Sequence, residues 1–147
     1  MDRVAKAREL FTSGYNCAQA VVGAYSDLFG MNPEEAMRAA EAFGGGMGRM
    51  RLTCGAVSGM FMLASLKYSK AEAKDTETRT KIYETVQKMA EEFKQKNVTI
   101  VCGELLGISK ADESSARPDE RTAQYYKKRP CIGCVEDCAE ITEKFLL

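Results

Sequence analysis

Apolar residues recur at intervals of three and four along most of the chain, which is the spacing of an amphipathic α-helix. The pattern predicts helices over residues 4–11, 17–29, 33–43, 54–68, 74–96, 118–128 and 131–146. The β-branched run at 98–101 has no partner strand, so we interpret it as a short turn. We therefore predict an all-α, single-domain helical bundle of about six to seven helices over residues 1–147.

Capping residues mark where these helices begin and end. Asn16 is a good N-cap for the second helix, and Gly30 ends it. Asn32, followed by proline and two acids, begins the third helix. Thr53 is predicted to cap the central buried helix, and Pro130 to open the last one.

A glycine-rich segment at 44–48 predicts a loop before the central buried helix. Arg49 and Arg51 follow it and are able to neutralise an anion held by the loop amides. The segment lacks the Lys-Ser/Thr pair of a P-loop and follows no strand, which disfavours nucleotide binding. We expect instead that the loop turns the chain sharply and brings Cys54 close to other backbone.

The charge balance argues against binding to nucleic acid, because Lys plus Arg and Asp plus Glu each number 21. The local basic run at 127–129 is interpreted as a solvated helix end. The most apolar stretch, 54–66, is shorter than the ~20 residues that cross a bilayer, and no secretory signal is visible. We predict a cytoplasmic protein without membrane insertion.

The sequence contains six cysteines and no histidine. Without histidine, Ser-His-Asp catalysis, Cys-His catalysis and imidazole ligation of zinc are excluded. Lasting disulfides are rare in the cytosol, so six thiols there indicate metal binding, catalysis or reversible redox chemistry.

Three cysteines, Cys17, Cys54 and Cys131, fall at predicted helix starts, and Cys102 is a candidate fourth. The first turn of a helix carries unpaired N–H groups and partial positive charge, which favour the reactive thiolate. Simple packing is the competing interpretation, because a free cysteine behaves as a small hydrophobic residue.

The last helix begins with a CxxC pair, Cys131 and Cys134, the arrangement that dithiol oxidoreductases use at a helix N-terminus. No βαβ unit precedes it, so a thioredoxin-like fold is not predicted. Cys138 continues the same seam and is interpreted mainly as core packing. Together with one more cysteine, these three thiols are also able to supply a zinc or iron–sulfur site.

Five segments in order carry a resemblance to a known family: Asn16–Val21, Phe43–Gly46, Cys54–Gly59, Cys102–Gly107, and Cys131 with Val135 and Ala139. They resemble the C_GCAxxG_C_C family of redox-active proteins. The resemblance implies a helical prokaryotic protein whose clustered thiols are Cys17, Cys54, Cys102 and Cys131. It implies no substrate, and it makes Cys134 and Cys138 additions to the family pattern.

The first functional hypothesis is a thiol/disulfide redox protein in which Cys54 attacks and a second cysteine resolves the mixed disulfide. Its partner would be a redox protein or a small thiol or disulfide substrate. The second is a zinc or iron–sulfur module that uses Cys17, Cys54, Cys102 and Cys131, with Cys134 as an accessory ligand and no turnover. The third is an interaction module whose cysteines only pack. The apolar stripe over 82–93 is able to pack internally or across a homodimer, and we predict the homodimer.

Overall fold

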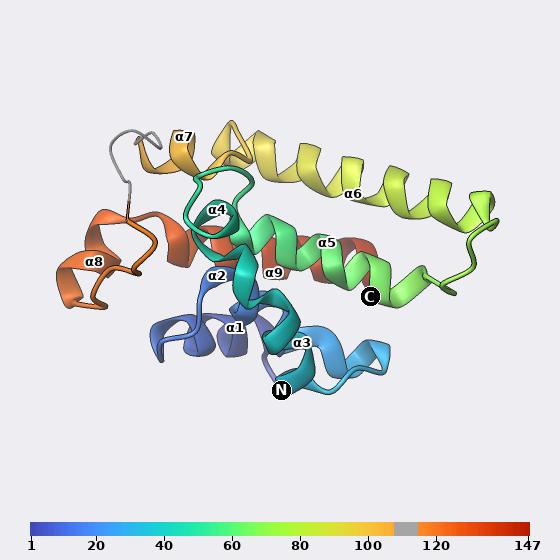
Figure 1. Cartoon of the computed structure of the whole chain (residues 1–147), viewed down its shortest axis with the longest axis horizontal. Helices are drawn as coiled ribbons and strands as arrows, with labels where there is room; N and C mark the ends of the chain where they lie inside the picture. The colour runs from blue at the N-terminus through green and yellow to red at the C-terminus, as the bar shows by residue number, and fades with distance from the viewer. Residues whose placement is uncertain (108–114) are drawn as a thin grey trace.

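The computed structural model describes residues 1–107 and 115–147, and these form an all-α bundle (Figure 1). The predicted fold class is therefore confirmed. The helices are α1 (Arg3–Thr12), α2 (Cys17–Tyr25), η1 (Ser26–Phe29), α3 (Pro33–Ala40), η2 (Glu41–Phe43), α4 (Gly44–Met47), α5 (Gly55–Tyr68), α6 (Thr76–Asn97), α7 (Cys102–Leu106), α8 (Ala123–Lys128) and α9 (Cys131–Leu146). Within the described ranges, no helix is both long and apolar enough to cross a membrane.

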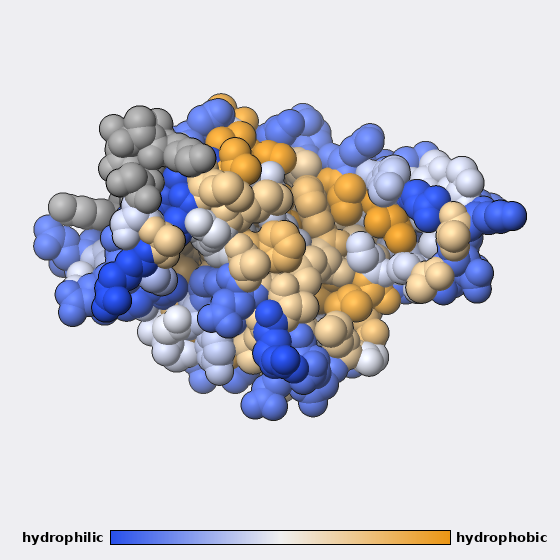
Figure 2. Space-filling model, in the orientation of Figure 1, coloured by the Kyte–Doolittle hydropathy of each residue, from blue (hydrophilic) through white to orange (hydrophobic). Residues whose placement is uncertain are grey.

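Helix α5 is the centre of the bundle and packs against α2, α6 and α9. All its residues from Gly55 to Met60 are buried, as expected of a helix whose first turns are enclosed by others. Its residues Met60 and Leu63 are fully buried, and Gly59 allows the backbone of α2 to approach at Ala18. Figure 2 shows that hydrophobic residues also gather over α5 on the face in view, whereas the outer side of α6 is mostly polar.

The apolar stripe of α6 packs within the chain. Met89 and Phe93 are fully buried, and α6 contacts both α5 and α9. Ile82 and Val86 are partly buried. The stripe is thus used internally over its second half, and the homodimer stays a prediction.

The predicted caps are confirmed at two helices and wrong at a third. Asn16 forms a capping box with Gln19, and the Asn32 side chain accepts from the first amides of α3. At α5, however, the N-cap is Cys54 and not Thr53. The reason is that Thr53 pairs with Val101 in a single antiparallel bridge, which keeps the chain extended up to Cys54. The expectation that the segment at 98–101 has no extended partner is therefore also wrong.

The glycine-rich segment makes a tight left-handed turn, labelled α4. All residues from Gly45 to Arg49 have positive φ, and Arg51 follows with φ of 61°. For a non-glycine residue such a conformation costs about 1–2 kcal/mol. Met47, Arg49 and Arg51 all adopt it, so the surrounding contacts must hold this loop firmly.

The predicted helix at 118–128 is shorter than expected and begins at Ala123. Thr122 caps it by accepting from the Tyr125 amide, and the residues before it form an irregular segment. Arg121 ties this segment to α1 and to the loop after it by donating to the carbonyl oxygens of Phe11 and Tyr15. The segment is thereby placed at the end of the bundle where α4 and α7 lie and where α9 begins (Figure 1).

Candidate redox site: a cavity lined by cysteines

Five of the six cysteines line one cavity of about 360 Å³. They are Cys17, Cys54, Cys102, Cys131 and Cys134. The structure thus brings together the four cysteines predicted as the site and adds Cys134. Cys138 is fully buried and is not among the lining residues. All six thiols are free.

The antiparallel bridge places Cys54 beside Cys102. The Cys54 amide donates to the Ile100 carbonyl at 2.7 Å, and the Cys102 amide donates to the Leu52 carbonyl at 2.5 Å. Thr53 and Val101 face one another between these bonds. Since successive side chains in extended backbone alternate in direction, Cys54 and Cys102 lie on the same face, toward the cavity.

The absence of a side chain at Gly55 leaves room for the Cys17 thiol. A Cβ atom on Gly55 would overlap the Cys17 Sγ and would lie 2.9 Å from the Phe43 carbonyl oxygen. The CGAVSG segment therefore fits closely against the start of α2, as expected from the sequence. The close approach of α2 and α5 brings the thiols of Cys17 and Cys54 to one cavity.

The expectation that helix N-termini make these thiols acidic is wrong. Burial, followed by the neighbouring thiols, raises the pKa of Cys17 and of Cys131 to about 12. Nearby amides, such as that of Gly45 at Cys17, oppose the rise only in part. Desolvation of a thiolate here outweighs the partial charge of the helix end.

Cys134 is the thiol with the largest influence on Cys54, and both line the cavity. The interaction with the Cys134 thiol, followed by burial, raises the pKa of Cys54 well above its usual value. A raised pKa keeps the proton on Cys54 near neutral pH, which disfavours the role expected for Cys54 as the attacking thiolate.

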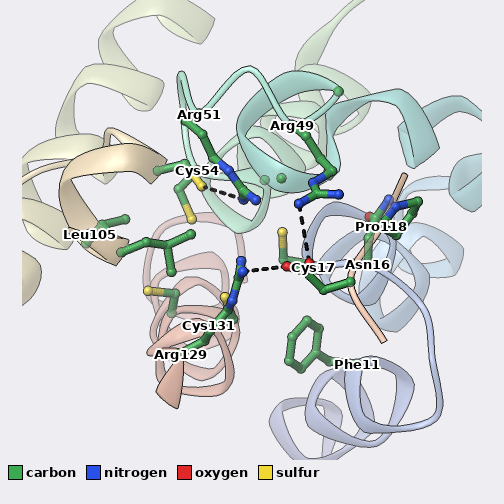
Figure 3. Close-up of a pocket in the computed structure, with 18 of the residues that line it drawn as sticks. Phe11, Asn16, Cys17, Arg49, Arg51, Cys54, Leu105, Pro118, Arg129 and Cys131 are labelled. Carbon is green, nitrogen blue, oxygen red and sulfur yellow. Dashed lines mark hydrogen bonds and ion pairs between the residues drawn. The ribbon is translucent and has the colours of Figure 1, made fainter. Parts of the chain in front are cut away.

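Cys102 differs from the other thiols because a guanidinium group contacts it. The Arg51 Nη1 donates to the Cys102 Sγ at 3.7 Å, and both residues are buried (Figure 3). Burial raises the pKa of Cys102, and Arg51 opposes that rise. The left-handed backbone at Arg51 directs this side chain into the cavity.

This contact gives a first prediction. Replacing Arg51 with glutamine removes the positive charge that opposes the effect of burial on the Cys102 thiol. The pKa of Cys102 therefore rises further, and its thiolate fraction at about pH 8 falls. The rate of alkylation at Cys102, measured by peptide mapping, should fall several-fold, and its pH profile should shift to higher pH. Arg38→Gln, at an exposed arginine paired with Glu35, is the matched control and should leave the profile unchanged. Equal rates in both variants would contradict the assignment.

Two charged residues that the sequence analysis did not assign to the site, Asp119 and Arg129, meet Arg49 at the same cavity. The Asp119 carboxylate accepts from Arg129 at 2.5 Å and from Arg49 at 3.5 Å (Figure 3). The interpretation of the basic run as solvated is therefore wrong for Arg129, which turns inward. No sequence signal paired Asp119 with Arg129. For Cys134 the sequence did offer a signal, the CxxC spacing with Cys131. The family pattern, however, makes Cys134 an addition to its four cysteines.

The geometry offers the zinc and iron–sulfur alternative no preformed ligand set. In residues 1–107 and 115–147, no group of three or more cysteine, aspartate or glutamate side chains is placed to hold a metal ion. The cysteines share a cavity, yet they do not converge on one point within it.

The fold and site define an all-α protein with a cavity lined by thiols. The family described as "Putative redox-active protein (C_GCAxxG_C_C)" matches residues 15–145, which is most of the chain. The protein therefore belongs to this family, as the resemblance implied. No curated protein and no solved structure matches the chain significantly.

Proposed function

We propose that this protein is a thiol–disulfide redox protein whose redox couple is Cys54 and Cys134. The observation that carries the proposal is that both thiols line one cavity and that Cys134 is the largest influence on the pKa of Cys54. Two cysteines close a disulfide without backbone movement when their Cα atoms lie within about 7 Å of each other. Its substrate class is a disulfide small enough to enter the cavity, or a disulfide presented on an exposed segment of a partner.

In the first step, Cys134 attacks as the thiolate after its proton has passed to solvent. The Cys54 S–H stabilises this thiolate by a hydrogen bond, because Cys54 retains its proton. A bond forms between the Cys134 Sγ and one substrate sulfur while the substrate S–S bond breaks. The departing substrate thiolate takes a proton from solvent.

In the second step, the Cys54 sulfur attacks the Cys134 Sγ in the mixed disulfide. The new Cys54–Cys134 bond forms, the remaining bond to substrate breaks, and the Cys54 proton goes to the second substrate thiol. Two electrons have then moved from the protein dithiol to the substrate disulfide. An external dithiol, or two equivalents of a monothiol, returns the protein to its reduced state.

Oxidation with the neutral probe bis(2-hydroxyethyl) disulfide tests this proposal. We expect the six free thiols to fall by two for each chain, with two molecules of 2-mercaptoethanol released. Peptide mapping without reduction should join the peptides that contain Cys54 and Cys134. The expected disulfide should reopen with excess dithiothreitol.

Two outcomes would overturn the proposal. One is a disulfide that joins other cysteines while Cys54 and Cys134 stay reduced. The other is stoichiometric zinc or iron in protein purified under argon, bound through the same cysteines and lost in Cys54→Ser. In the second case the cysteines serve as ligands, as the alternative hypothesis predicts.

A further inference from the structure

Among the described residues that line the cavity, positive charges outnumber negative ones, and the redox couple itself does not explain this. The charged ones are Arg49, Arg51, Arg121, Arg129, Glu41 and Asp119. In residues 1–107 and 115–147, four cations thus face two anions around this cavity. Arg121 is already engaged with carbonyl oxygens of α1 and its loop, and Arg51 contacts Cys102. Arg49 and Arg129 are the pair that converge on a single carboxylate.

That carboxylate is more exposed than the cations that hold it. The Asp119 side chain is 40% exposed, against 12% for Arg49 and 20% for Arg129. It belongs to the irregular segment before α8 and lines the cavity. Figure 3 shows the side chains of Arg49 and Arg129 pointing toward the same part of the cavity. An incoming carboxylate would find two partly buried guanidinium groups already placed for charge-assisted hydrogen bonds.

The left-handed loop adds a second, independent sign that the arginines are positioned for a ligand. Arg49 adopts φ of 64°, at a cost that most surface arginines do not carry. The conformation sends its guanidinium inward, so that its side chain is largely covered. An arginine needed only for solubility would need neither the strain nor the burial.

We infer that the cavity selects small disulfides that carry a carboxylate, which binds Arg49 and Arg129 in place of the Asp119 carboxylate. This inference rests on the proposed function for its redox step and adds the substrate class. In the absence of substrate, the Asp119 carboxylate occupies the place of the substrate carboxylate and offsets the repulsion between the two arginine charges. Displacement of Asp119 leaves the substrate sulfurs beside the thiols that line the same volume.

Three disulfides of similar size test the inference by their charge. They are 3,3′-dithiodipropionate, which is anionic, bis(2-hydroxyethyl) disulfide, which is neutral, and cystamine, which is cationic. We expect the anionic disulfide to oxidise the protein about tenfold faster than the neutral one, as one charge-assisted hydrogen bond would give. Cystamine should be the slowest. The ratio of the anionic to the neutral rate is the readout, because it cancels changes in thiol reactivity.

Substitutions at the two arginines and at Asp119 are expected to change this ratio in opposite directions. Arg49→Gln and Arg129→Gln should lower it toward one. Asp119→Asn should raise it, because the competing internal carboxylate is gone. A merely structural role for Asp119 predicts the reverse, since loss of the brace would disorder both arginines. Arg38→Gln, at an exposed arginine that is not among the cavity residues, should leave the ratio unchanged.

Octanedioate separates this inference from the proposed function. It has two methylenes where dithiodipropionate has sulfurs, so it is not reducible, and we expect calorimetry to detect its binding to the wild type and not to Arg129→Gln. Binding of octanedioate with no oxidation by any disulfide would support the carboxylate site and overturn the redox function. Oxidation at equal rates by all three disulfides, with no octanedioate binding, would overturn the carboxylate site and leave the redox function standing.

Discussion

Replacing Gly46 with alanine is expected to lower the free energy of unfolding by about 3 kcal/mol, from backbone strain and overpacking together. Gly46 has φ of 69°, a conformation that an alanine adopts only at a cost. The added Cβ would lie 2.5 Å from the Cys102 Cβ and 2.8 Å from two backbone atoms, the Arg51 Cα and the Leu52 nitrogen. Backbone atoms have no rotamer by which to move away. Urea unfolding measures the loss.

Gly30→Ala is the matched control for this prediction. Gly30 also has positive φ, at 80°, but no atom lies within 4 Å of its hypothetical Cβ. It should lose only the conformational part, about 1–2 kcal/mol. The difference between the variants therefore measures the collision at the cavity wall. Equal losses in both variants would show that the loop does not press on Cys102.

The fold was predictable from the sequence because its signals are local. Helical periodicity and the caps at Asn16 and Asn32 act over a few residues, and the structure confirms them. The errors arise where distant segments meet. Thr53 is of a residue type common at N-caps, yet its pairing with Val101 moves the start of α5 by one residue. No residue near Thr53 in the sequence predicts that bridge.

The site was predictable in its composition and less so in its chemistry. Helix starts singled out Cys17, Cys54 and Cys131, the family resemblance added Cys102, and all four line the cavity. The sign of their pKa shifts was wrong, because the helix N-terminus is visible in the sequence while the depth of burial is not. The influence of Cys134 on Cys54 and the inward turn of Arg129 depend on how α9 packs against α5.

Substitution of Cys134 by serine is expected to abolish oxidation by disulfide probes, because no thiolate is left to attack beside Cys54. Cys138→Ser is the matched control, since Cys138 lies one turn further along α9, is also buried, and is not among the cavity residues. It should lose stability to a similar extent and still react. Loss of two thiols from Cys134→Ser at the wild-type rate would contradict the assignment of Cys134 as the attacking thiol.

The site of the mixed disulfide in Cys54→Ser tests the central claim most directly. Without the resolving thiol, the first step should proceed and the second should stop, so the probe should stay bound to the protein. After reaction with bis(2-hydroxyethyl) disulfide and quenching in acid, we predict one 2-mercaptoethanol adduct for each chain, located at Cys134 by mass spectrometry of its peptides. An adduct at Cys102 or at another cysteine, with Cys134 unmodified, would contradict the account.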